Sequence, residues 1–143
     1  MLLGRPRYEE ALHVVRDAYS KHCRLLGEDD RESLVLAENY ASSLGSQRRY
    51  GEAKALLRKT IPVARRVLGE DHQLTIKMRW LYAAALCENE DATLDNLREA
   101  VTTLEETERT ARRVFGGAHP TTVGIGGALQ DARAALRDTP GST

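Results

Sequence analysis

The apolar positions of this chain recur at steps of three and four residues, the period of an amphipathic helix. No stretch shows the sustained alternation of apolar and polar residues that marks a half-buried strand. The pattern therefore predicts an all-α chain of about six helices. The expected spans are 6–26, 31–45, 49–68, 73–87, 92–115 and 120–137. Pro62 falls inside the third span, where we expect one kinked helix rather than two.

Two short motifs recur along the chain in the same phase. Leu-Gly-Glu-Asp-His at 68–72 is related to Leu-Gly-Glu-Asp-Asp at 26–30 and to Phe-Gly-Gly-Ala-His-Pro at 115–120. Each copy ends one helical pattern and opens another, and the glycines are 42 and 47 residues apart. Tyr-Glu-Glu-Ala at 8–11 and Tyr-Gly-Glu-Ala at 50–53 repeat the 42-residue interval. Two independent marks with one period predict a repeat array.

Length and composition narrow the class of protein further. The chain has 143 residues, enough for one domain, and its formal net charge is zero, which argues against a general nucleic-acid binder. No apolar run approaches the roughly 20 residues of a membrane span, and the first residues are too soon polar for a secretory signal. Cys23 and Cys87 fit neither a disulfide framework nor a zinc site. We therefore expect a cytoplasmic protein without a cofactor or metal.

These motifs resemble tetratricopeptide repeats, specifically the 42-residue type of kinesin light chains. The residues that carry the resemblance are the stretches at 50–53, 68–72 and 115–121, and it covers roughly residues 1 to 130. It implies a solenoid of antiparallel helix pairs with a right-handed superhelical turn. We expect one array over 1–137, with a partial first repeat at 1–27, repeats at 28–69 and 70–116, and a capping helix at 117–137. Residues 138–143 are expected to form a disordered tail.

The resemblance also implies a concave groove for extended peptides, lined by the first helix of each pair. In that family paired asparagines in the groove hold the peptide backbone, and the matching positions here are Glu38 and Asn39, then Trp80 and Leu81, then Gly127 and Ala128. Of these six positions, only position 39 carries an asparagine. Tryptophan and arginine often anchor interfaces. The candidate groove residues are Glu38, Asn39, Lys77, Arg79 and Trp80. Alternatively, Trp80 simply packs between adjacent helix pairs.

Catalysis is not expected, because no nucleophile, base and orienting group can be assembled from these residues. His72 and His119 occupy equivalent repeat positions and are interpreted as helix-entry residues.

Two functions remain open after enzymes are set aside. The first is a non-catalytic interaction module that presents its groove to a protein or an extended, possibly acidic, peptide. The alternative is a structural segment of a longer array, acting as a scaffold or oligomerisation unit. A homodimer is a further expectation, because the helix after Tyr8 lacks the helix that precedes it in a complete repeat. The candidate self-association residues are Leu2, Leu3, Val15 and Tyr19.

Overall fold

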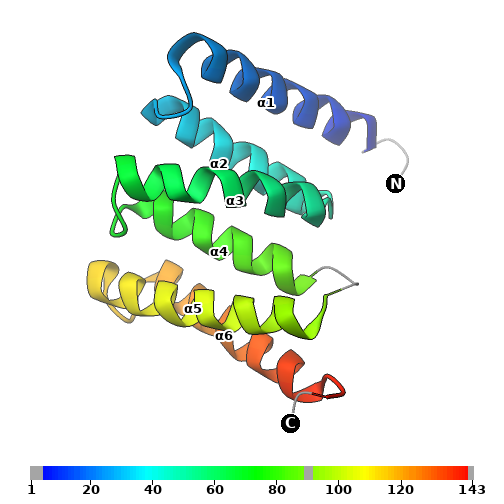
Figure 1. Ribbon diagram of the computed structural model, residues 1–143, viewed down its shortest axis with the longest axis vertical. Coiled ribbons are helices and arrows are strands. Elements are labelled where there is room, and N and C mark those ends of the chain that lie inside the picture. Colours follow the sequence, from blue (N-terminus) through cyan, green and yellow to red (C-terminus); the bar gives the residue numbers. More distant parts are fainter. Residues whose placement is uncertain (1–4, 89–91, 142–143) are drawn as a thin grey trace.

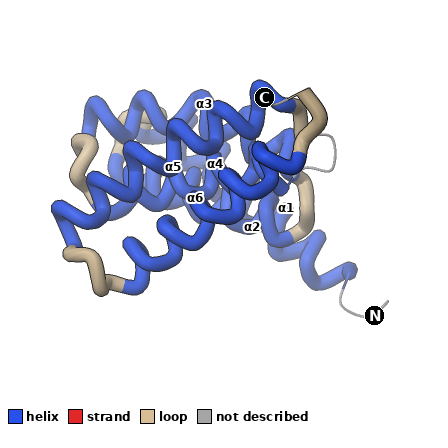
Figure 2. The backbone as a smooth tube through the Cα atoms, turned by 90° about the horizontal axis from the view of Figure 1, so that it is seen from below, coloured by secondary structure: helices blue, strands red, loops and turns tan. Residues whose placement is uncertain are grey.

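The computed structural model describes residues 5–88 and 92–141. In this part of the chain all regular structure is helical, as the apolar periodicity predicts (Figures 1 and 2). Each helix boundary lies within two residues of the predicted one, and α3 runs through Pro62 as one element. The six helices of the described part are α1 (Arg5–Leu26), α2 (Arg31–Ser46), α3 (Tyr50–Val67), α4 (Gln73–Glu88), α5 (Leu94–Phe115) and α6 (Pro120–Asp138).

The recurring motif ends one helix and caps the next. Its glycines have φ angles of 91°, 96° and 93°, a left-handed conformation that costs glycine no steric clash. Three residues after each glycine, a side chain accepts a hydrogen bond from the backbone N–H two residues further on. The acceptors are Asp30 Oδ2, His72 Nδ1 and His119 Nδ1, at 3.0, 3.0 and 3.1 Å. The helix-entry interpretation of His72 and His119 is therefore confirmed.

Each helix packs against the next one along the chain, so the helices form a stack with α1 and α6 at its two ends (Figure 1). The backbone of α4 also packs closely against both α2 and α6. In the described part of the chain the backbones of α1, α3 and α5 do not approach one another in this way, and side chains bridge them instead, as Arg58 of α3 does to Glu99 of α5 at 3.6 Å. The helices therefore form two layers, α2, α4 and α6 in one and α1, α3 and α5 in the other. This is the arrangement expected for a tetratricopeptide-like array.

A continuous apolar core joins the layers. Its largest members are at most 1% exposed, and burying a leucine or isoleucine contributes roughly 1.5–3 kcal/mol. They are drawn from five of the helices and include Leu34, Leu44, Leu57, Ile76, Leu86, Leu104 and Ile125.

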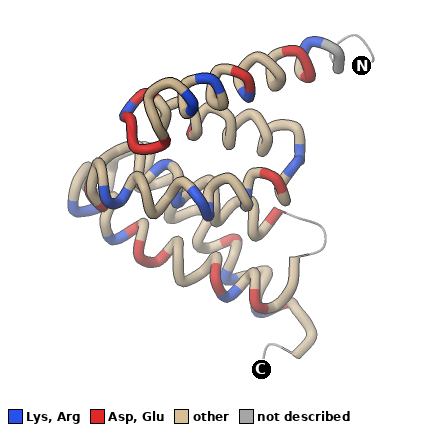
Figure 3. Tube along the Cα trace, turned by 45° about the horizontal axis from the view of Figure 1, so that its top comes forward, with Lys and Arg blue, Asp and Glu red and all other residues tan. Residues whose placement is uncertain are grey.

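An ion pair recurs with the repeat at the surface. Both terminal guanidinium nitrogens (Nη1 and Nη2) of Arg66 donate to Asp29, at 3.1 and 2.9 Å, and both of Arg113 donate to Asp71, at 2.8 Å. Each arginine lies near the end of a helix and reaches back to the turn that precedes the previous helix. Acidic and basic residues are accordingly interleaved along the stack (Figure 3). The paired guanidinium lowers the pKa of Asp29 and of Asp71.

The ends of the array lie partly outside the described residues. Helix α6 ends at Asp138, and the disordered tail over 138–143 stays a prediction. The hydroxyl of Thr139 still donates to the carbonyl of Ala135 at 2.7 Å. Residues 142–143 lie outside the described part of the chain. The division into repeats at 28–69 and 70–116 stays a prediction.

Candidate functional site

A pocket of about 360 Å³ opens where α2 and α4 lie side by side. Its volume is comparable to that of a small-ligand cleft. Small residues on both helices leave the space, and larger side chains form the walls. The small residues are Ala41, Ser42 and Gly45 on α2 and Ala84 on α4, and the walls include Tyr50, Lys77, Trp80 and Leu81. The structure thus brings two of the predicted groove residues, Lys77 and Trp80, to one surface.

The indole of Trp80 lies against α6 as well as the pocket. A Cβ built on Gly124 would lie 2.5 Å from Cη2 and 2.8 Å from Cζ2 of Trp80. Non-bonded carbon atoms do not approach so closely, so the glycine at this position makes room for the ring. The indole is still partly exposed. Trp80 therefore both packs between helix pairs and lines the pocket, which joins the two alternatives that the sequence left open.

Lys77 forms an ion pair at the edge of this pocket. Its Nζ lies 3.2 Å from Oε1 of Glu38, which is only 5% exposed. The same oxygen has no partner in hydrogen-bond geometry, so we interpret the contact as a charge pair rather than a directed bond. The ammonium end of Lys77 stays accessible, since its side chain is 55% exposed. Asn39, the next residue along α2, is exposed and does not line the pocket.

Arg79 points to a different part of the molecule. It is buried, and its guanidinium bonds to Glu70 at 3.2 Å and to Glu106 at 2.7 Å. Glu70 is also paired with Arg65 at 2.7 Å. With 3.6 residues per helical turn, neighbours such as Arg79 and Trp80 are about 100° apart around the axis. Arg79 therefore joins α4 to α5 and does not reach the pocket.

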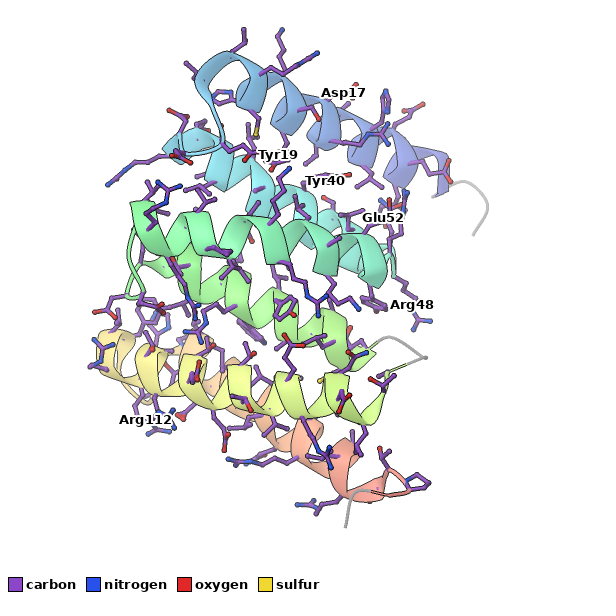
Figure 4. The ribbon with its side chains drawn as sticks, viewed as in Figure 1. Asp17, Tyr19, Tyr40, Arg48, Glu52 and Arg112 are labelled. Atoms are coloured by element: carbon purple, nitrogen blue, oxygen red, sulfur yellow. The ribbon has the colours of Figure 1, made fainter. Side chains whose placement is uncertain are left out.

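The predicted self-association residues are also separated by the structure. Tyr19 is only 7% exposed, with its ring 5.9 Å from that of Tyr40 on α2 (Figure 4). Burial, together with the nearby Cys23, raises the pKa of Tyr19. Tyr19 is thus a core residue rather than an exposed one. Val15 is partly buried, and Leu2 and Leu3 lie outside the described residues.

The residues that the sequence did not single out for the pocket are the small ones. Ala41, Gly45 and Ala84 carry no functional group, so no chemical motif draws attention to them. The sequence pattern that could have predicted the pocket is the spacing of the small residues on α2, which are one helical turn apart. In the structure they face the aromatic Trp80 on α4.

Reactive chemistry is sparse in the described residues. They contain no group of three or more histidine, cysteine and acidic side chains that could hold a metal ion. Burial, aided by Glu88 and Asp131, raises the pKa of Cys87 to about 11, so its thiol is poorly ionised near neutral pH. None of the described helices has an apolar stretch long enough to cross a bilayer.

The two layers of sequential helices, with a pocket between neighbouring helices of one layer, define a helical-repeat protein. Residues 34–74 match the family model described as tetratricopeptide repeat. The matched stretch covers most of α2, all of α3 and the start of α4, and it is a repeat of the kinesin-light-chain type. Domains of this kind are generally protein-interaction modules and are typically non-catalytic. A comparison with curated proteins gives no match.

Proposed function

We propose that this chain is a non-catalytic interaction module that binds an extended protein segment across α2 and α4. The observation that carries the proposal is the pocket beside Trp80, about 360 Å³ in volume and lined mainly by alanine, glycine and aromatic side chains. A partly exposed tryptophan in a hollow is the kind of anchor that dominates binding energy at interfaces.

The pocket favours a ligand with one apolar side chain at its centre. Burying such a side chain contributes roughly 1.5–3 kcal/mol. Lys77 at the edge suits an acidic residue next to that apolar one, although Glu38 already neutralises part of its charge. We therefore expect apolar burial to supply most of the affinity, with a smaller contribution from charge that weakens as salt rises.

Peptides selected from a random phage-displayed library on the immobilised chain test this proposal. Trp80 is the only tryptophan, so its emission reports directly on the pocket. Binding of a selected peptide should shift the emission of Trp80, and Ala84→Phe, which fills the pocket, should abolish both binding and the shift. Ala55→Phe adds the same ring to an exposed position of α3 outside the pocket and is the matched control. Peptides that bind both variants equally would contradict the proposal.

The alternative, a structural segment of a longer array, is favoured by a different observation. Four of the seven exposed large apolar side chains among the described residues lie on α1, at one end of the stack. A further repeat stacked on α1 would cover them. If the isolated chain binds the selected peptides without any change in the emission of Trp80, this alternative is favoured.

A further inference from the structure

Helix α1 carries an apolar stripe that nothing covers in the described part of the chain. Tyr8, Val14 and Leu25 are 64%, 65% and 71% exposed. Together with Ala11 they form a series, at positions 8, 11, 14 and 25. The steps of three, three and eleven residues keep all four on one side of the helix. Their exposure is unusual, because among the described residues the other helices expose at most one large apolar side chain each.

The internal repeat shows that this stripe is a packing surface. The residues 42 positions later, on α3, are Tyr50, Ala53, Leu56 and Val67. Ala53 is 2% exposed and Leu56 is 9% exposed, because α2 and α4 pack on α3. Within the described residues, the backbone of α1 packs closely against that of α2 alone, and Lys59 of α3 reaches over the ring of Tyr19 at 5.9 Å. The face that α3 buries at Ala53 and Leu56, and partly buries at Tyr50 and Val67, is therefore open in α1.

The opposite end of the stack is built differently. Leu44 on α2 and Leu86 on α4 are each 1% exposed, but the equivalent position on α6 is Arg133, which is exposed and paired with Glu105 at 2.8 Å. Gln130 on α6 replaces the buried Ala41 and Ala83 in the same way. Helix α6 thus presents a polar outer face, which a terminal repeat needs for solubility. Addition of a second copy's α1 onto α6 would bury these polar groups, which disfavours open head-to-tail association.

The charges on α1 suit pairing with itself. Glu10 lies in the first half of the helix, and Lys21 and Arg24 lie in the second half, all exposed. None of the three makes an ion pair within the described residues. Two α1 helices that cross antiparallel bring Glu10 of each copy toward Lys21 and Arg24 of the other. Asp17, near the centre of α1, has a carboxylate oxygen 3.1 Å from Nε2 of His13.

We infer that a second copy of this chain covers the α1 stripe, with the two α1 helices antiparallel about a twofold axis. Such an interface is closed, because the same patch serves both copies. It uses Tyr8, Val14 and Leu25 in place of the buried Tyr19. It is also separate from the pocket beside Trp80, so it stands or falls independently of the proposed function.

Light scattering coupled to size exclusion, over a dilution series, tests the inference. The chain should show twice its monomer mass of 15.9 kDa and dissociate on dilution. Val14→Glu combined with Leu25→Glu should give the monomer mass with unchanged helical circular dichroism, since both side chains are exposed in the single copy. Val123→Glu is the matched control on α6, where Val123 is 59% exposed, and should remain dimeric.

Charge reversal tests the antiparallel register. Glu10→Lys should raise the dissociation constant of the dimer severalfold, and adding Lys21→Glu and Arg24→Glu to the same chain should restore it. Three results would overturn the inference: a monomer mass for the unaltered chain at every concentration, masses that grow beyond the dimer, or a dimer that survives Val14→Glu with Leu25→Glu. A triple variant that dimerises no better than Glu10→Lys would overturn the antiparallel arrangement.

Discussion

Gly124 and Trp80 fit together across α6 and α4, because the absent Cβ of the glycine leaves the space that the edge of the indole occupies. A Cβ at residue 124 would lie 2.5 Å from Cη2 of Trp80. The glycines of α6 are therefore not equivalent, although all of them lower helix propensity in the same way. The glycine at 124 leaves room for the indole beside the pocket. A Cβ at Gly126 or Gly127 would meet nothing within 4 Å beyond the adjacent backbone of its own helix.

This relationship predicts opposite outcomes for two alanine substitutions in one helix. Gly127→Ala should raise the free energy of unfolding by about 1 kcal/mol, because alanine is the better helix former and meets no obstacle. Gly124→Ala should fail to show this gain and should shift the emission of Trp80, since the new methyl displaces the ring. Urea unfolding and intrinsic fluorescence measure both effects. Equal gains in stability from the two substitutions, with unchanged emission, would show that the contact is unimportant.

The repeated ion pairs predict local changes in acid titration. The pKa values of Asp29 and Asp71 should lie below the ordinary value of about 3.9, because each carboxylate is paired with a guanidinium. Stability from these pairs is present above the unfolded pKa and is lost as the pH falls through the folded one. Arg113→Gln should return the pKa of Asp71 toward normal and leave that of Asp29 unchanged. Carboxyl-carbon NMR titration provides the measurement, and a shift of both residues in this variant would contradict the assignment.

The raised pKa of the partly buried Cys87 thiol predicts that the protein loses stability at alkaline pH. An unfolded thiol titrates near about 8.5, whereas burial raises the pKa of Cys87 to about 11 in the fold. Between these values the unfolded chain has lost a proton that the folded chain keeps, so the free energy of unfolding falls as the pH rises. The contribution of the protonated Cys87 thiol to stability is fully present below the pKa of the unfolded thiol.

Urea unfolding at a series of alkaline pH values should therefore show a shallower decline for Cys87→Ala than for the unaltered chain. Tyr19 and Tyr82, whose pKa values are also raised by burial, are present in both proteins and cancel in the comparison. Identical slopes for the two proteins would rule out the thiol as a source of the decline.

The capping role of the histidines predicts that one substitution at His72 lowers stability and that another preserves it. His72→Ala removes the acceptor for the N–H of Leu74 and should lower the free energy of unfolding by about 1 kcal/mol, as loss of a helix cap usually does. His72→Asp should retain most of the stability, because the first copy of the motif already uses Asp30 in this way. Thermal unfolding followed by circular dichroism distinguishes the two. An aspartate variant as unstable as the alanine variant would contradict the capping role.

The helices and their ends were predictable because local sequence determines them. Glycine with positive φ ends three helices, and the cap that follows three residues later begins the next, so the repeating motif at 26–30, 68–72 and 115–120 marks the boundaries directly. The long-range arrangement of antiparallel neighbours then follows from short turns.

The site was predicted less well, because it depends on rotation about the helix axis. Lys77 and Trp80 are three residues apart and share a face, whereas Arg79 is turned toward Glu106 on α5. The rotation about the helix axis also explains Tyr19, which was predicted as a self-association residue. Its side chain points toward Tyr40 on α2 and is not part of the exposed stripe of α1. Apolar periodicity identifies a stripe but does not show which edge of it the neighbouring helix covers.

Binding of a ligand in the pocket beside Trp80 can be followed residue by residue in an NMR titration. A library-selected peptide is added to the ¹⁵N-labelled chain, and the single indole N–H signal is followed together with the backbone amides. The indole signal of Trp80 and the amide signals of Gly45 and Ala84 should move together and saturate at one peptide concentration. Shifts confined to the surface around Arg79 and Glu106, with the indole signal unmoved, would contradict binding in this pocket.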